Sequence, residues 1–199
     1  PLEFRDHAWS KDPQGHAVGA SGFRISHICP FGVAVMSVSD DEGETFSNPA
    51  PIIDTALDDR DTGLCPFSKS GLIFTSFNNT VHFQKKYMFD LTEEQTEFAH
   101  AYLNTVNQSE EKRDLGANFR VSSDNGITFG PIHKSPVTSP HGPIELSDGT
   151  ILWVGRKFNN DSETVNDDDF IYACKIEPYS GKCEIISKIE PIVFKNKKL

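Results

Sequence analysis

The sequence predicts an all-β fold that is assembled from repeated four-stranded units. Short apolar or alternating runs are separated by Gly, Pro, Asn and Asp along most of the 199 residues. An acidic, glycine-centred octapeptide occurs twice, as SDDEGETF at 39–46 and as SSDNGITF at 122–129. Each copy follows an apolar run and precedes a short apolar segment with prolines, so the two copies mark equivalent points of one repeat.

Six runs are predicted to be strands, because they are rich in β-branched or aromatic residues and are bounded by turn residues. They are GVAVMSVS (32–39), GLIFTSF (71–77), ANFRVSS (117–123), TILWVGRKF (150–158), FIYACKIE (170–177) and CEIISKIE (183–190). Turns are expected at KSG (69–71), SDG (147–149) and YSG (179–181). Each unit therefore runs strand, tight turn, strand, long loop, strand, octapeptide turn, strand, which is typical of a β-propeller blade.

One segment departs from this pattern. LTEEQTEFAHAYLNTVNQ (91–108) is predicted to be a helix inserted between strands, since Thr92 and Gln95 fit a capping box. Helical spacing places five residues on one face, namely Phe98, Ala101, Tyr102, Thr105 and Val106. Asn107 and the charged run 110–114 are expected to end the helix. The insertion either packs over a sheet edge or forms one wall of a binding site.

The octapeptides are predicted to be structural turns. Gly43 and Gly126 supply a positive-φ position. The aspartates can accept hydrogen bonds from amides of their own turn, the hydroxyls can add further bonds, and the Phe rings can pack on a sheet. The residues given this structural role are Ser39, Asp41, Gly43, Thr45, Phe46, Ser122, Asp124, Gly126, Thr128 and Phe129. Neither copy has the ligand pattern of a calcium loop, and we expect no metal and no cofactor.

The pattern S-x-D-x-G-x-T-F resembles the Asp-box, or BNR repeat, of the sialidase superfamily. DTALDDRD (54–61) and SPHGPIELSDG (139–149) also look like segments of bacterial sialidase-like proteins. The resemblance implies a six-bladed β-propeller whose Asp-boxes lie on the face opposite the active site.

The chain is expected to hold less than a full propeller. Residues 1–53 are interpreted as a partial blade, 54–138 as a blade with the helical insertion at about 91–108, and 139–199 as a blade with EPYSGK as a degenerate Asp-box. This is under three blades, whereas a closed ring needs roughly four to eight. Because an open stack leaves unpaired edges, we expect missing sequence or a partner chain to supply the remainder.

Composition and charge exclude some classes of binding partner. A net charge of −10 argues against nucleic acid, and no apolar run is long enough to span a membrane. The first residues, PLEFR, do not resemble a signal peptide, although the family resemblance leaves a secreted or periplasmic location open. None of the cysteines forms a C-x-x-C pair. The turn at 178–181 should leave Cys174 diagonal to Cys183, where we expect free thiols rather than a disulfide.

Chemistry is expected on the face opposite the octapeptides. Asp59 and Asp61 are the candidate catalytic carboxylates, and the candidate substrate-binding residues are Arg60, His141, Arg156 and Arg5. Arginine suits the carboxylate of an acidic sugar because its donors form a fork. Each residue has a structural alternative: DDRD as a salt-bridge cluster, His141 as a turn residue and Arg156 as a surface residue.

The resemblance implies a retaining glycosidase in which three arginines hold the substrate carboxylate, a Tyr–Glu pair is the nucleophile and an Asp is the acid/base. The F/Y-R-I-P segment of the first arginine is absent from this sequence and is expected before Pro1, with the late Tyr and third arginine beyond Leu199. The prediction is a fragment of a sialidase-like glycoside hydrolase, inactive alone, acting on a terminal acidic sugar of a glycoconjugate or polysaccharide. The alternative is a non-catalytic β-propeller that binds carbohydrate or protein.

Overall fold

Three antiparallel sheets form the framework of the described chain. The computed structural model describes residues 10–11, 17–18, 28–89, 91–157, 170–190, 193–194 and 197–198. Arg5 therefore lies outside the described residues, as does most of the partial blade expected before residue 28. No helix in the described part of the chain is long and apolar enough to cross a membrane.

The strands follow one another in chain order within each sheet. The first sheet pairs β3 (Ala34–Met36) with β4 (Ala50–Ile53). The middle sheet has four strands in the order β5 (Arg60–Phe67), β6 (Gly71–Phe77), β7 (Ala117–Ser122) and β8 (His133–Ser135). All strands predicted from the sequence overlap observed ones, and β6 has the predicted limits.

In the last sheet, two short strands share the edge position. Both β9 and β10 pair with β11, which then pairs with β12 and β13. Their limits are β9 Val137–Thr138, β10 Ile144–Glu145, β11 Ile151–Lys157, β12 Ile171–Glu177 and β13 Lys182–Ile189. Two short strand pairs complete the list, β1 Ser10–Lys11 with β2 Ala17–Val18 and β14 Val193–Phe194 with β15 Lys197–Lys198.

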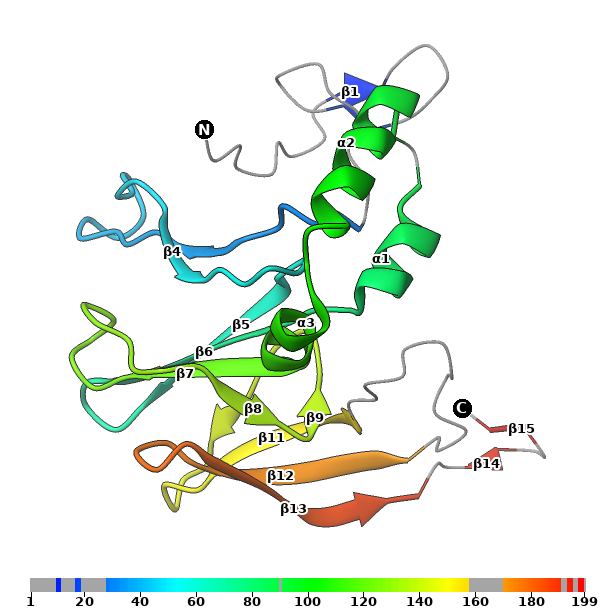
Figure 1. The fold of residues 1–199 in the computed structure, drawn as a ribbon. Coiled ribbons are helices and arrows are strands. Elements are labelled where there is room, and N and C mark those ends of the chain that lie inside the picture. Colours follow the sequence, from blue (N-terminus) through cyan, green and yellow to red (C-terminus); the bar gives the residue numbers. More distant parts are fainter. Residues whose placement is uncertain are drawn as a thin grey trace.

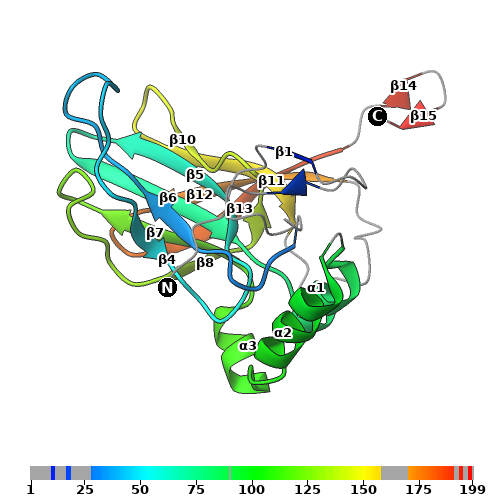
Figure 2. The same cartoon turned by 90° about the horizontal axis from the view of Figure 1, so that it is seen from above.

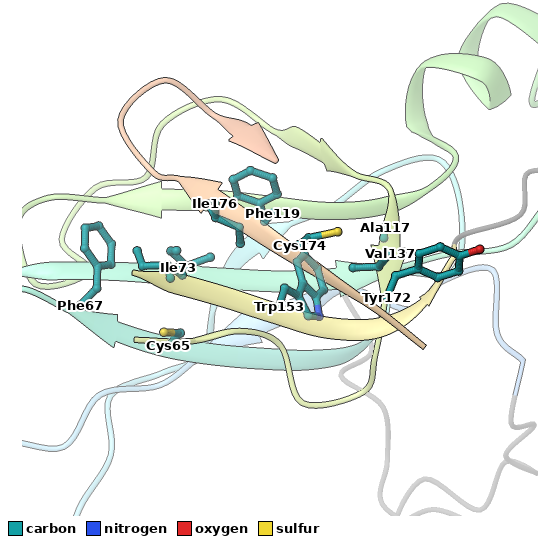
Figure 3. Packing of buried hydrophobic residues seen from close by; sticks show 11 residues of the cluster. Cys65, Phe67, Ile73, Ala117, Phe119, Val137, Trp153, Tyr172, Cys174 and Ile176 are labelled. Carbon is teal, nitrogen blue, oxygen red and sulfur yellow. The ribbon is translucent and has the colours of Figure 1, made fainter. Parts of the chain in front are cut away.

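The three sheets lie as successive layers (Figure 1). The core between the middle and last sheets draws on both, and Figure 3 shows its side chains interleaved between the strands. Its buried members are Cys65, Phe67, Ile73, Ala117, Phe119, Val137, Ile151, Trp153, Tyr172, Cys174 and Ile176. A second cluster joins the first sheet to the opposite face of the middle sheet through Ala34, Ile52, Ile53 and Phe74. The middle sheet is thus covered on both faces.

The all-β class is confirmed, since sheets dominate and helices are few. Among the described residues the sheets form an open stack and do not close into a ring.

The insertion between β6 and β7 holds three helices, α1 (Val81–Tyr87), α2 (Glu93–Leu103) and α3 (Gln108–Asp114). The predicted capping box of α2 is present: the Gln95 amide donates to Thr92 Oγ1 at 3.2 Å, and the Thr92 amide donates to Gln95 Oε1 at 3.0 Å. The prediction that Asn107 and the charged run end the helix was wrong. Asn107 caps α3, because its Oδ1 accepts from the amides of Ser109 and Glu110.

The predicted apolar face of the helix was also wrong. The structure buries Ala99 and Leu103 of α2 in a cluster with Ile28 and Met88, whereas Phe98 is 66% exposed. The helix is short and packs mainly on α1 and on the segment near residue 28, so tertiary contacts rather than its longest apolar stripe decide its orientation.

The octapeptide turns and the helices lie at opposite ends of the sheets. The turns that follow β3, β7 and β12 lie together at one end, on the left in Figure 1, and the helices lie at the other. Figure 2 gives the same separation from a second direction. Since the sheets are antiparallel, the start of β5 and the segment between β9 and β10 lie at the helical end.

Candidate functional site

The two octapeptides have the same internal hydrogen bonds. Ser39 Oγ donates to Asp41 Oδ1 at 2.7 Å, and the Thr45 amide donates to the same oxygen at 2.8 Å. In the second copy the corresponding distances to Asp124 Oδ1, from Ser122 Oγ and the Thr128 amide, are 2.7 and 2.9 Å. The threonine hydroxyl bond, with help from the amide and serine bonds, lowers the pKa of each aspartate to about 2.

The backbone conformation explains why each of these turns contains a glycine. Gly43 has φ +93° and Gly126 has φ +83°, and the residue before each glycine is also left-handed. Phe129 packs near Phe74, with ring centroids 6.2 Å apart, but Phe46 is 65% exposed, so the expectation that both rings are buried was wrong for the first copy. Each carboxylate bonds within its own turn, which supports a structural role for both copies.

The start of β5 contains a β-bulge. Arg60 lies opposite Phe77 while Gly63 lies opposite Thr75, so β5 has one extra residue here. Asp61 takes up this irregularity in the left-handed region, with φ +49°. Bulges redirect side chains and are frequent beside active sites. Here the bulge leaves Asp61 exposed, with 37% of its side chain accessible.

His141 lies beside this bulge. A Cβ placed on Gly63 would be 2.7 Å from both the Gly142 nitrogen and the His141 carbonyl carbon, so the two backbones are in direct contact. The Gly63 amide donates to Thr75 Oγ1 at 3.1 Å, and the same oxygen lies against Gly142. The structure therefore brings the exposed Asp61 and His141 to neighbouring segments, as their positions in the repeat predicted.

Arg60 is buried and faces acidic groups. Its side chain is 4% exposed, with Nη1 3.6 Å from Asp58 Oδ2 and Nε 3.7 Å from Asp61 Oδ2. Its guanidinium also lies over the Phe77 ring, 5.8 Å from the centroid. This geometry agrees with the salt-bridge interpretation of DDRD and fixes the segment from which Asp61 projects.

Asp59 lies in a buried hydrogen-bond network. It is 1% exposed and accepts from the Thr55 amide at 2.5 Å and from Asn78 Nδ2 at 3.1 Å. Burial raises its pKa to about 7, although these hydrogen bonds oppose the shift. Burial is therefore the dominant influence on the pKa of this carboxyl group.

Arg156 points away from this group. Along β11 the side chains of Ile151 and Trp153 are buried toward the middle sheet, whereas Val154 and Arg156 are exposed. Because successive strand residues alternate between faces, Arg156 lies on the outer face of the last sheet. The candidates brought together are thus Asp59, Arg60, Asp61 and His141.

Three aromatic residues near this site were not assigned to it from the sequence. The Phe31 ring lies 5.4 Å from that of Phe98 and 5.0 Å from that of Tyr102. Tyr102 donates to the Ala56 carbonyl at 3.3 Å, and the Asp59 amide donates to the Gly32 carbonyl at 3.1 Å, so the cluster adjoins the start of β5. The only sequence-based indication of this cluster was the expectation that the helical insertion forms one wall of a binding site.

Replacing Gly63 by alanine is expected to lower the free energy of unfolding by about 1–3 kcal/mol, because the new methyl group meets fixed backbone at His141 and Gly142. Gly130→Ala is the control, since its nearest neighbour would be 3.5 Å away, and we expect a change within about 0.5 kcal/mol. Chemical denaturation measures both variants. Equal stability of the two would contradict the contact between β5 and the His141 segment.

Asp59 should make stability depend on pH. Its pKa is raised from 3.8 to about 7, so the folded protein retains a proton that the unfolded chain has released. Stability is therefore fully present below about pH 4 and falls as pH rises to about 7, with a slope of up to about 1.4 kcal/mol per pH unit. Denaturation curves across this range should show the slope in the wild type and lose it in Asp59→Asn. An unchanged slope in the variant would assign the effect to another group.

Comparison with known proteins gave no relative. No protein-family model matches the chain, and neither the curated proteins nor the solved structures contain a match.

Proposed function

We propose that the chain is part of a sialidase-like glycoside hydrolase that acts on a terminal acidic sugar. The observation that carries the proposal is the repeated octapeptide, whose two copies share one hydrogen-bond pattern at the same end of successive stacked sheets. This is the arrangement that the resemblance to Asp-box proteins implies, with chemistry at the opposite end. There the bulge leaves Asp61 exposed, and Gly63, two residues further on, contacts the backbone of His141 and Gly142.

The stack supports a larger β-propeller. Phe129 of the middle sheet packs toward the first sheet, so its equivalent Phe46 would pack toward a sheet on the other side. Val154, Ile186 and Ile189 similarly leave an exposed apolar surface on the last sheet. In the proposal, further sheets from additional sequence or from a partner chain cover both faces and complete the ring.

The proposed role of each candidate site residue follows from the solvent exposure of its side chain. Asp61 is the candidate catalytic residue that can touch a sugar, and His141 can donate a hydrogen bond to the substrate. Arg60 holds Asp61 in place through the ion pair at 3.7 Å. Asp59 is a positioning residue, because it is buried and bonded to Thr55 and Asn78. The exposed Phe31 and Phe98 rings offer apolar surface for a sugar ring.

The alternative, a non-catalytic binding propeller, is favoured by one observation. Of the two candidate catalytic carboxylates, Asp59 is buried and only Asp61 reaches the surface. A retaining glycosidase needs a second group, a nucleophile, at the reacting carbon. Binding and hydrolysis therefore have to be measured separately.

Saturation-transfer NMR on the chain tests the proposal with N-acetylneuraminic acid, glucuronic acid and neutral galactose. We expect binding of an acidic sugar, weakened roughly tenfold by His141→Ala. Asp148→Asn, at the octapeptide end, is the control and should bind as the wild type does. Equal binding of galactose would overturn the acidic-sugar assignment, and binding of none would overturn both functions.

Release of methylumbelliferone from a 4-methylumbelliferyl sialoside distinguishes the two proposed functions, the glycoside hydrolase and the non-catalytic binding propeller. We expect none from the chain alone. Release that is lost in Asp61→Asn would establish a complete catalytic apparatus, whereas binding with no release in a completed ring would favour the binding protein.

A further inference from the structure

Two of the cysteines lie on neighbouring strands of the last sheet. In the β12–β13 pairing Cys183 lies opposite Ile176, and Cys174 lies opposite Ile185. The thiols are therefore diagonal neighbours on one face, which is the face turned to the middle sheet. The diagonal register and the free thiols expected from the sequence are confirmed.

We propose that Cys174 and Cys183 form a reversible redox pair, which a peroxide oxidises to a disulfide between β12 and β13. Both side chains lie on the face of the sheet that is turned to the middle sheet, and Cys183 Sγ lies 3.6 Å from Ser135 Oγ. Cys174 is buried, whereas Cys183 is half-buried on β13, the last strand of its sheet. Opening of an edge strand would let a small oxidant reach Cys183 without unfolding the core.

The two thiols differ in reactivity. The hydrogen bond from Cys174, together with the Ser135 hydroxyl, lowers the pKa of Cys183 although burial opposes it. The pKa of Cys174 is raised by the same contact and by burial. Since the thiolate is the nucleophile, Cys183 is the attacking sulfur and Cys174 the resolving one.

The reaction balances with hydrogen peroxide as the oxidant. The Cys183 thiolate attacks one peroxide oxygen, the O–O bond breaks, and a sulfenic acid forms with release of hydroxide. The Cys174 sulfur then attacks the Cys183 sulfur, loses its proton, and expels the sulfenic hydroxyl as a second hydroxide that the proton neutralises. In sum, two thiols supply two electrons, peroxide becomes two molecules of water, and one S–S bond forms.

The geometry favours a bond that is readily reduced. Diagonal strand neighbours have Cα atoms about 7–8 Å apart, beyond the usual disulfide range of about 4.4–6.8 Å. Closing the bond therefore requires the strands to shift, and strained disulfides are the more easily reduced ones. A bulge between Ala173 and Cys174 supplies a place for that shift.

The other two cysteines provide internal controls. Cys65 is buried in β5, where burial raises its pKa. Cys29 lies in the segment whose amide donates to Asp58, far from β13 in the chain. Neither is placed with the pair on the β12–β13 hairpin.

Peptide mapping of the folded chain after hydrogen peroxide treatment and alkylation tests the proposal. We expect one bridge between Cys174 and Cys183, loss of the mass of two hydrogen atoms, and reversal by dithiothreitol. Cys65→Ser should leave the bridge unchanged. In Cys174→Ser the sulfenic acid of Cys183 should persist and react with dimedone, and Ser135→Ala should slow alkylation of Cys183 roughly threefold.

Three results would overturn the pair: no bridge in the folded wild type, a bridge to Cys29 or Cys65, or dimedone labelling of Cys183 that is equal in the wild type and in Cys174→Ser. Wild-type mapping needs no substitution, so it stands even where a variant folds poorly.

Discussion

Trp153→Ala is expected to lower the free energy of unfolding by about 3–5 kcal/mol, the largest effect of any single substitution considered. Trp153 is 1% exposed and lies in the core between the middle and last sheets, with its ring centroid 6.5 Å from that of Phe119 (Figure 3). Its Nε1 also donates to Ser139 Oγ at 2.9 Å, which ties the segment before His141 to the core. Chemical denaturation measures the loss.

Two variants separate packing from hydrogen bonding at this position. Trp153→Phe retains most of the apolar volume but loses the bond to Ser139, so we expect a smaller effect than for alanine. Val154→Ala, on the exposed face of the same strand, should change stability by about 0.5 kcal/mol or less. A loss below about 1 kcal/mol in Trp153→Ala would contradict the shared core of the two sheets.

Asn78→Ala is expected to lower the free energy of unfolding by about 3 kcal/mol, because it leaves several buried polar groups without their partner. Asn78 Nδ2 donates to Asp59 Oδ1 and to the Asp114 carbonyl, both at 3.1 Å. Its Oδ1 accepts from the Gly116 amide at 2.8 Å. One side chain thus joins the start of β5 to the end of α3.

Asn104→Ala is the matched control, since Asn104 is exposed and its Oδ1 accepts only a surface bond from Lys85 Nζ among the interactions described. We expect a change within about 0.5 kcal/mol for this variant. If Asn78→Ala proved equally mild, the helical insertion would not depend on the buried network for its attachment.

Local patterns predicted the sheets well. Apolar runs bounded by turn residues located β6, β7, β11, β12 and β13, because runs of this length and composition are typical of strands buried on one or both faces. The limits of the helices were harder to predict from the sequence. Asn107 is equally suited to ending one helix and capping the next. The polar segment 108–114 has no apolar periodicity that would mark it as α3.

The candidate site was predictable only as a set of segments. Repeat alignment placed residues 60–61 and 141 at one end, and the structure puts these segments in contact. Burial of Arg60 and Asp59 was not predictable, since charged residues are mostly exposed and only tertiary contacts with Thr55, Asn78 and Asp58 permit it. The bulge at Asp61 likewise depends on pairing with β6 and leaves no mark in the sequence.

In the proposed function, a terminal acidic sugar binds at the end of the sheets opposite the octapeptide turns. The most direct measurement is the map of backbone amide shifts in a ¹⁵N-labelled chain titrated with N-acetylneuraminic acid and with glucuronic acid. We predict that the saturable shifts caused by one of these sugars cluster at residues 58–63 and 139–142, with residues 39–46 and 122–129 unchanged. Shifts centred on the octapeptides, or no saturable shift with either sugar, would contradict the proposed function.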